Sequence, residues 1–316
     1  MQSLGPELRM TQILGVLTRR SVLLAADRRL TEIGTGRVVH DDTCKIVSLC
    51  NAAGIAYTGL ARLDGIPTHE WICHRLADAV VRRAAEAIPV ITESATQSFM
   101  KLPTRNLYPH TFLLAGYESF LHAGVKPMFA LITNMRNSSG ETLQSPAPTF
   151  IAFQFVLPAQ QRIHSVAAGA RLSSSRHAAL VRNMGRAYSR NTSDEALLRL
   201  MTETIVQTSR RPTMAVGERV LTMSIPKDSV DPTSRMSVML AAPATTDAAT
   251  FGYLVPGASR VLQYGPSFVC GDHAVTDIVT QDDPSRDLQS VSVRILRLPK
   301  RLDGHGERIA ATDGAD

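Results

Sequence analysis

Two apolar runs near the start of the chain are separated by only two residues, and this spacing limits the fold more than any other feature. Residues 11–18 read TQILGVLT, residues 21–27 read SVLLAAD, and only Arg19 and Arg20 lie between them. Both runs have the length and apolar content of strands, and a short polar connection joins antiparallel neighbours. The sequence therefore predicts a β-hairpin over residues 11–27.

Blocks of strand-like and helix-like sequence follow this hairpin. Residues 44–50 and 54–59 predict two more strands, and a helical period runs from Thr68 to about Phe99, with Thr68 as the N-cap and Pro89 dividing two helices. Further strands are predicted at residues 110–117, 127–133, 149–157, 162–169, 218–225, 235–242 and 250–257, and further helices at 174–188 and 193–209. Such blocks favour an α+β fold with two stacked antiparallel sheets between layers of helices, an αββα sandwich.

Composition favours a folded protein without a membrane segment. The 316 residues are 44% hydrophobic and 20% charged, and no apolar run reaches the length of about 18 residues that spans a bilayer. The start of the chain lacks the pattern of a secretory signal, so we expect a cytoplasmic protein with no membrane partner. Four cysteines without metal-site spacing or the density of a disulfide scaffold predict reduced thiols.

Charge and metal-site spacing exclude two further classes of function. The net charge of +6 comes from 34 basic and 28 acidic residues. Because the arginines are interspersed with acids and few aromatics, we expect no nucleic-acid partner. His69, Glu70 and His74 have one spacer residue too many for a zinc-binding H-E-x-x-H helix, so we expect no metal and no cofactor.

The first hairpin also carries a motif. Thr11 begins the first strand, Gly15 lies within it, and Asp27, Arg29 and Thr31 follow the second strand as D-x-R-x-T. This pattern resembles the N-terminal hairpin of proteasome β-type subunits and of their bacterial relatives in the N-terminal nucleophile (Ntn) hydrolase family. The resemblance implies the Ntn hydrolase fold, with Thr11 as the catalytic nucleophile.

Two later segments extend the resemblance. CKIVSL resembles the family strand that carries the active-site lysine, here Lys45. GIAYTGLARLDG resembles the family junction at which Gly59 supplies the oxyanion N–H and Ala61 contacts substrate. The resemblance is good from Met10 to about Ala87 and weaker over residues 110–133 and 193–211. It implies a core over residues 11–225, preceded by an extension (1–10) and followed by further strands and a polar tail (226–316).

The chemistry of this family explains the residue types. A threonine hydroxyl is a weak nucleophile, and an adjacent α-amine with a pKa of about 7.7–8.0 is a suitable base for it. A lysine near the hydroxyl stabilises negative charge, and an aspartate orients the lysine. The resemblance thus assigns catalysis to Thr11, Lys45 and Asp27, a supporting role to Arg29, and substrate contact to Thr31 as well as Ala61.

The α-amine of Thr11 exists only if Thr11 is the first residue. Translation from Met10, followed by removal of that methionine, would expose this amine without cleavage of a propeptide. We expect Met10 to be the functional start, and the alternative is self-cleavage after Met10.

The later part of the family site matches less well. The family commonly carries an aspartate, a serine and two glycines after its final helix, where this chain has Pro212 and Ala215 and retains Gly217. A family glycine-serine loop appears here as AAGARLSSS, in which Ser173, Ser174 or Ser175 is a possible substitute. The second-shell support of Thr11 therefore differs from the family pattern.

The resemblance implies a threonine-type hydrolase that cleaves amide bonds of peptides or unfolded proteins and assembles as a homo-oligomer, either a ring or something smaller. Two alternatives remain open. One is a catalytically inactive structural subunit of the same fold, and the other is an amidase that acts on small molecules.

Overall fold

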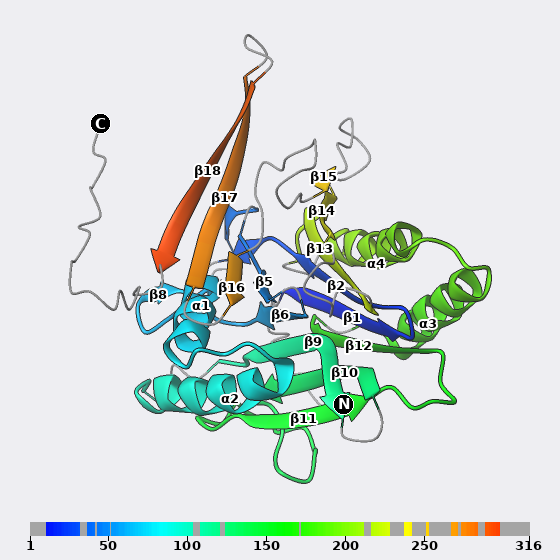
Figure 1. Ribbon diagram of the computed structural model, residues 1–316. Coiled ribbons are helices and arrows are strands. Elements are labelled where there is room, and N and C mark those ends of the chain that lie inside the picture. The colour runs from blue at the N-terminus through cyan, green and yellow to red at the C-terminus, as the bar shows by residue number, and fades with distance from the viewer. Residues whose placement is uncertain are drawn as a thin grey trace.

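The computed structural model describes residues 11–31, 37–41, 43–50, 52–103, 108–120, 124–170, 172–211, 216–227, 237–241, 251–252, 267–270, 273–283 and 288–297. Within these residues the chain is a mixed α/β structure with several antiparallel sheets and four helices (Figure 1). The predicted extension 1–10, with Met10, and most of the predicted polar tail lie outside the described residues.

Two large sheets form the centre of the molecule. The strand order of the first sheet is β12-β1-β2-β13-β14-β15, and all its neighbours are antiparallel. Its strands are β1 (Gln12–Thr18), β2 (Ser21–Asp27), β12 (Ile163–Gly169), β13 (Val220–Pro226), β14 (Ser237–Ala241) and β15 (Phe251–Gly252). The predicted hairpin is confirmed, and β1 and β2 lie in the interior of this sheet.

The strand order of the second sheet is β11-β10-β9-β6-β5-β16-β17-β18, in which only the β5–β16 pair is parallel. Its strands are β5 (Ile46–Leu49), β6 (Ala53–Thr58), β9 (Thr111–Phe120), β10 (Gly124–Thr133), β11 (Ile151–Val156), β16 (Ser267–Cys270), β17 (His273–Asp283) and β18 (Leu288–Arg297). The β17–β18 hairpin extends well beyond the other strands (Figure 1). Two short ladders complete the strands, β3 (Leu30–Thr31) with β4 (Val38–His40) and β7 (Arg62–Leu63) with β8 (Ile66–Pro67).

The side chain of Thr18 closes the first hairpin. Its hydroxyl oxygen accepts a hydrogen bond from the Ser21 N–H at 2.9 Å and donates one to the Ser21 carbonyl at 2.8 Å. The register then pairs Leu17 with Val22 and continues to Ile13 with Ala26. A one-residue slip would move every side chain of these strands to the opposite face, so this turn determines which residues meet the second sheet.

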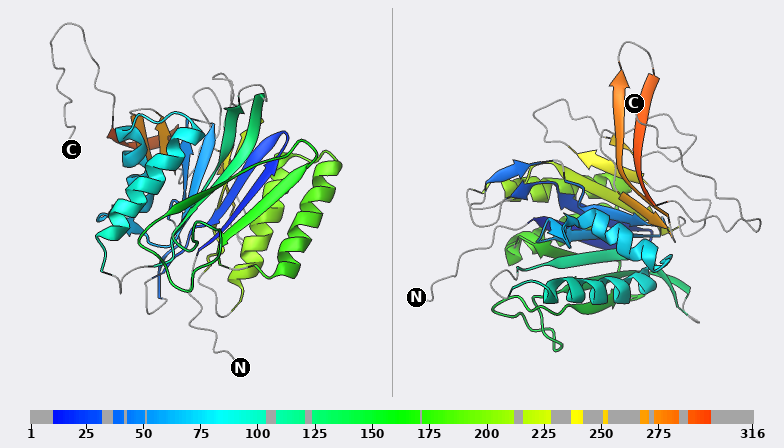
Figure 2. Two further views of the ribbon diagram at one scale, coloured as in Figure 1. Left: turned by 90° about the horizontal axis from the view of Figure 1, so that it is seen from below. Right: turned by 90° about the vertical axis from the view of Figure 1, so that its left-hand side faces the viewer.

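Four helices cover the outer faces of the sheets. They are α1 (Thr68–Asp78), α2 (Ala84–Met100), α3 (Ser174–Ser189) and α4 (Asp194–Ser209). Figure 2 shows α1 and α2 on one side of the sheets and α3 and α4 on the other. The layer order is therefore helices, sheet, sheet, helices, as the block pattern of the sequence predicts.

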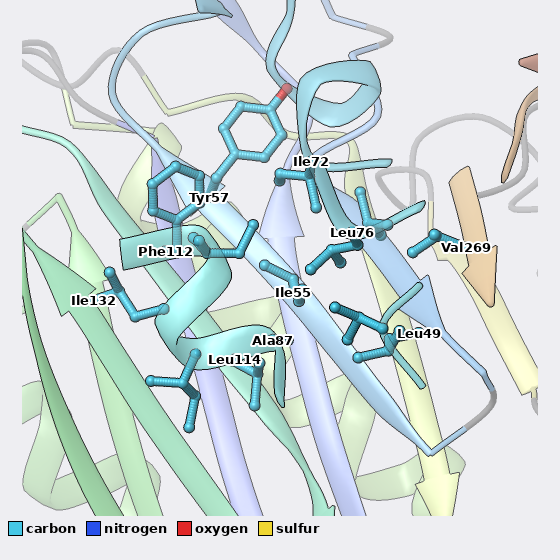
Figure 3. Packing of buried hydrophobic residues seen from close by; sticks show 14 of the residues in the cluster. Leu49, Ile55, Tyr57, Ile72, Leu76, Ala87, Phe112, Leu114, Ile132 and Val269 are labelled. Carbon is cyan, nitrogen blue, oxygen red and sulfur yellow. The ribbon is translucent and has the colours of Figure 1, made fainter. Parts of the chain in front are cut away.

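Alternate side chains of β1 separate two of the three buried clusters. Ile13 and Leu17 pack between the sheets, whereas Leu14 and Val16 pack under α3 and α4. The third cluster lies between the second sheet and α1 and α2, and it includes Tyr57, Phe112 and Leu76 (Figure 3). Because β1 is covered on both faces, all of its residues are buried and its sequence is almost entirely apolar.

The helix boundaries differ from prediction in two places. The break between the first two helices lies at residues 79–83 and not at Pro89, which lies inside α2. The carboxylate of Glu86 accepts hydrogen bonds from the N–H groups of Arg82 and Arg83, and this capping box begins α2 at Ala84, five residues before the proline. The predicted N-cap is off by one residue, since Pro67 is the cap and Thr68 is the first helical residue.

The cysteine prediction is wrong for Cys50, which is disulfide-bonded, whereas Cys44 and Cys73 are free. Cys50 directly follows β5, and its N–H donates to the Val269 carbonyl of the parallel strand β16 at 2.9 Å. The spacing of cysteines along the sequence gives no indication of such tertiary neighbours.

No helix in the described part of the chain is both long enough and apolar enough to cross a bilayer.

Candidate active site

Thr11 lies at the start of β1 and is held there by its backbone. Its carbonyl accepts hydrogen bonds from the Ala170 N–H at 2.9 Å and from the Thr58 hydroxyl at 3.2 Å. Gly169 has φ +82°, and a Cβ at this position would lie 1.8 Å from the Thr11 carbonyl oxygen. Glycine is therefore required where β12 passes the start of β1.

The ammonium group of Lys45 joins three elements at this point. Lys45 lies just before β5, and its side chain is 3% exposed. Its Nζ donates to Thr11 Oγ1 at 2.5 Å and to the Arg29 carbonyl, and it lies 3.4 Å from Asp27 Oδ2. All three donors of the ammonium are thus used, which orients it toward the Thr11 hydroxyl.

Asp27, at the end of β2, is completely buried and saturated with donors. Its Oδ1 accepts from the Gln12 N–H at 2.7 Å, and its Oδ2 accepts from the N–H groups of Arg29 and Gly217, both at 3.1 Å. Burial raises the pKa of Asp27, while the charge of Lys45 and the three N–H groups act in the opposite direction. Burial likewise lowers the pKa of Lys45 against the attraction of Asp27. A buried lysine with a lowered pKa is suited to share a proton with a hydroxyl.

Arg29 connects Asp27 to a further layer of contacts. Its guanidinium is bidentate to Asp41, with Nε to Oδ1 at 2.7 Å and Nη2 to Oδ2 at 3.3 Å, and the hydrogen bond to Asp41 raises the pKa of Arg29. Its Nη1 donates to the Val216 carbonyl at 3.2 Å. Arg29 therefore holds the segment whose next residue, Gly217, binds Asp27.

Gly59 follows β6 directly and has φ +116°. A Cβ here would lie 2.5 Å from the Pro109 carbonyl oxygen and 2.7 Å from His110 Nδ1, so no other residue fits without movement. Because the preceding residue, Thr58, binds the Thr11 carbonyl, the backbone of Gly59 lies beside the start of β1. This is the region in which an oxyanion donor for Thr11 is needed.

His110 holds the backbone next to Gly59 through a hydrogen bond. Its Nδ1 accepts from the Leu60 N–H at 3.0 Å, which places the proton of the neutral ring on Nε2. The ring is fully buried among Tyr57, Phe99 and Phe112, and burial lowers its pKa to about 3. The sequence offered no signal for this role, because His110 is only the first residue of a predicted strand and is 50 residues from Leu60.

The remaining predicted residues have other contacts. Thr31 is half-buried and pairs with Val38 in the β3–β4 ladder, and Ala61 is half-buried with its carbonyl bound to the Thr68 N–H. Ser173 is exposed and caps α3 by accepting from the Arg176 N–H at 3.4 Å. The described hydrogen bonds do not connect any of these residues with the Thr11 hydroxyl.

The predicted substitutions at Pro212 and Ala215 lie outside the described residues. Within the residues that are described, no group of three or more histidine, cysteine or acidic side chains has the geometry of a metal site.

Gly217 and Asp41 complete the network around Asp27, although the sequence pattern predicts no role for either residue. Gly217 has no room for a side chain, since a Cβ would lie 2.7 Å from Arg29 Cβ. The only sequence signal was that this glycine remained where the rest of the family pattern was lost.

No protein-family model matches the sequence, and a search of curated proteins finds no similar protein. The functional assignment therefore depends on the motif in the first hairpin and on the geometry of Thr11, Lys45 and Asp27.

Proposed function

We propose that this protein is a threonine-type hydrolase of the Ntn family, similar to proteasome β-type subunits, and that it cleaves peptide bonds through an acyl-enzyme on Thr11. The observation that carries the proposal is the 2.5 Å contact between Lys45 Nζ and Thr11 Oγ1, with Asp27 holding the lysine from the other side. The two stacked sheets between helix pairs support the same family assignment.

The proposed reaction requires Thr11 to be the first residue of the mature chain. Its α-amine removes the hydroxyl proton as Oγ1 attacks the carbonyl carbon of the substrate amide. The Gly59 N–H donates to the oxyanion of the tetrahedral intermediate. The C–N bond then breaks, the amine base returns the proton to the leaving nitrogen, and an ester forms on Thr11.

Water completes the cycle. The same α-amine takes a proton from water as the water oxygen attacks the ester carbonyl, and the carboxylic acid product leaves with the Thr11 hydroxyl restored. Lys45 stabilises the developing negative charge on Oγ1 in both halves of the reaction. Asp27 positions Lys45, and Arg29 supports Asp27 through the segment of residues 216–217.

The test compares chains that begin at Thr11, released from a cleavable fusion, with chains that retain residues 1–10. Both are treated with a peptidyl epoxyketone, which is a probe for an N-terminal threonine, and analysed by intact mass. We expect one adduct only on the chain that begins at Thr11, with retention in Thr11→Ser and loss in Thr11→Ala. Absence of the adduct from a folded chain with a free Thr11 amine would contradict the proposal.

Lysine variants test the role of the buried ammonium. Lys45→Met removes the contact with Thr11, whereas Lys101→Met is a matched control because Lys101 is 67% exposed. We expect labelling of Lys45→Met to be slower by at least about 100-fold, in line with the loss of one preorganised charge-stabilising donor. Lys101→Met should label at the wild-type rate.

An inactive structural subunit is the second candidate, and the position of Ser173 favours it. In the described structure this serine caps α3 and does not support Thr11. A folded chain that presents a free Thr11 amine, forms no adduct and assembles into a homo-oligomer would support this alternative. Turnover of small acyl amides but not of peptides would indicate the small-molecule amidase.

A further inference from the structure

Positive charge is concentrated in one part of the chain. Residues 142–193 contain no aspartate, glutamate or lysine, and their arginines are Arg162, Arg171, Arg176, Arg182, Arg186 and Arg190. The charge of these six arginines equals the formal net charge of the whole chain, +6. The rest of the chain therefore has equal numbers of basic and acidic residues. The prediction that arginines are interspersed with acids does not hold for this segment.

The fold gathers four of these arginines around one hollow. The hollow has a volume of about 520 Å³ and is lined by Arg162, Arg182, Arg186 and Arg190 together with Gly185, Tyr188 and Ser189. Arg162 comes from the connection between β11 and β12, and the other three arginines follow one another at four-residue intervals along and just after α3. Residues four apart share a helix face, so α3 presents its three guanidinium groups together.

This arrangement opposes the stability of α3. Like charges four residues apart on a helix repel each other, and no carboxylate lines the hollow in the part of the chain that the structure describes. The negative end of the helix dipole favours Arg186 and Arg190 but has little effect on Arg182, which lies further from the C-terminus. An anion in the hollow would remove the repulsion.

Gly185 gives a second, independent indication. A glycine inside a helix is destabilising relative to alanine. Packing does not require it here, because a Cβ on Gly185 would meet no heavy atom within 4 Å. The missing side chain leaves the helix backbone uncovered where Gly185 lines the hollow, and this allows a ligand to approach the backbone closely.

One wall of the hollow is held in place. The Arg20 guanidinium lies 4.9 Å from the centroid of the Tyr188 ring, and its Nη1 donates to Asn191 at 2.7 Å. Arg20 belongs to the β1–β2 turn, so the hollow lies at the opposite end of β1 from Thr11, about 20 Å away at the rise of a strand. The hollow is therefore separate from the candidate active site.

We propose that this arginine hollow binds a compact anion with several phosphate groups, such as inorganic tripolyphosphate or the triphosphate of a nucleotide. Guanidinium groups bind phosphate oxygens in bidentate fashion, and the volume is within the range of small-ligand sites. A hollow localised at one end of one helix fits a compact anion better than a nucleic acid, which requires an extended basic stripe. This inference is independent of the hydrolase proposal.

The test is titration calorimetry of the full chain with tripolyphosphate and, separately, with ATP at about 0.15 M ionic strength, where non-specific attraction is screened. We expect saturable binding of tripolyphosphate. Equal affinities would identify the phosphate chain alone as the ligand, and tighter binding of ATP would identify a nucleotide.

Variants on one helix locate the site. Arg182→Gln with Arg186→Gln should weaken binding by at least about tenfold, because two charge-assisted contacts are lost. Gly185→Ala should also weaken it, without removing any charge. Arg176→Gln is the matched control, because Arg176 is exposed on α3 but does not line the hollow.

Three results would overturn the proposal. These are absence of saturable binding to the folded wild-type protein, equal weakening by Arg176→Gln and by the double variant, and tighter binding of a single-stranded oligonucleotide than of either phosphate compound.

Discussion

The two ends of strand β1 differ in whether the protein itself compensates the positive charges nearby. At the Thr11 end, the ammonium of Lys45 is 3% exposed and has three oxygen partners, on Thr11, Asp27 and Arg29. At the Arg20 end, the exposed Arg162, Arg182 and Arg186 surround an open hollow that no carboxylate lines among the described residues. One end compensates its charge within the protein, and the other leaves it available.

The difference follows from the free energy of solvation. A buried charge without partners costs several kcal/mol, so an interior lysine persists only where the fold supplies an anion and further acceptors. An exposed guanidinium remains hydrated and loses only the few tenths of a kcal/mol of like-charge repulsion. The interior site is therefore preorganised by the fold, whereas the surface site depends on a ligand from outside.

The largest expected effect comes from removing the anion at the buried end. Asp27→Ala leaves Lys45 buried without its counter-ion and three N–H groups without an acceptor, and we expect a loss of about 3–5 kcal/mol in the free energy of unfolding. Urea denaturation measures it. Asp194→Ala, which removes a carboxylate that is 24% exposed and is bound by Ser21, Ser224 and Arg20, is the control with an expected loss of about 1–2 kcal/mol.

Combining Asp27→Ala with Lys45→Met should cost less than the sum of the two single variants, because no uncompensated charge remains. Additive losses would mean that the two side chains are not coupled, and the contrast between the two ends of β1 would fail.

The second effect concerns the close approach at Thr11. Gly169→Ala places a Cβ within 1.8 Å of the Thr11 carbonyl oxygen, and we expect a loss of at least about 3 kcal/mol in thermal or urea unfolding. Gly65→Ala is the matched control, since Gly65 also has a positive φ of +84° but has nothing within 4 Å of its Cβ. Only the backbone strain of about 1 kcal/mol is expected there. Equal losses would show that the contact with Thr11 is not tight.

The third effect is a dependence of the free energy of unfolding on pH, and it comes from the buried ring of His110. The pKa of His110 is lowered from 6.5 to about 3, so the ring is neutral in both states above pH 6.5. As the pH falls from 6.5 toward 3, the unfolded chain binds a proton that the folded chain does not. The free energy of unfolding therefore decreases by up to about 1.4 kcal/mol per pH unit in this window.

His110→Asn tests this dependence, because Asn offers Oδ1 in place of Nδ1 as the acceptor for the Leu60 N–H and does not titrate. Between pH 6.5 and pH 4.5 we expect the wild type to lose about 2 kcal/mol more than the variant in urea denaturation. Parallel losses would show that His110 is not buried as a neutral ring.

The smallest effect belongs to the exposed end. Arg182→Gln removes one like-charge pair with Arg186 and should raise the free energy of unfolding of the ligand-free protein by about 0.3 kcal/mol. Arg182→Lys should leave it unchanged, because this variant keeps the positive charge. A destabilising Arg182→Gln would show that the arginine makes a contact within the protein, and that the hollow is already compensated.

Much of the secondary structure follows from short stretches of sequence. The hairpin over residues 11–27, the strand that contains Ile46 and the helix after Ser193 were all predictable, because each depends on a local apolar pattern, a short turn or a cap. The prediction that Pro89 divides two helices is wrong, because the local penalty against a proline inside a helix does not decide the break on its own. Here the capping box of Glu86 begins α2 before the proline. The disulfide of Cys50 is not predictable from the local spacing of the cysteines.

For the candidate site, the order of residues alone named Thr11, Asp27 and Lys45, through the resemblance of the first hairpin to a known family. Their contacts were decided by tertiary structure. Lys45 meets Thr11 only because the second sheet stacks on the first, and Asp27 obtains its third N–H from Gly217 only because β13 pairs with β2. His110 and the arginine hollow likewise depend on segments brought together by the fold.

The sequence by itself determined which segments are strands or helices and which side chains carry the candidate chemistry. Backbone conformation and the alternation of apolar residues are local properties of the chain, so short stretches of sequence predict them. Only the tertiary structure decided which charges are compensated. The free energy of a charge depends on its burial and on partners from other segments, and neither exists until the sheets have stacked.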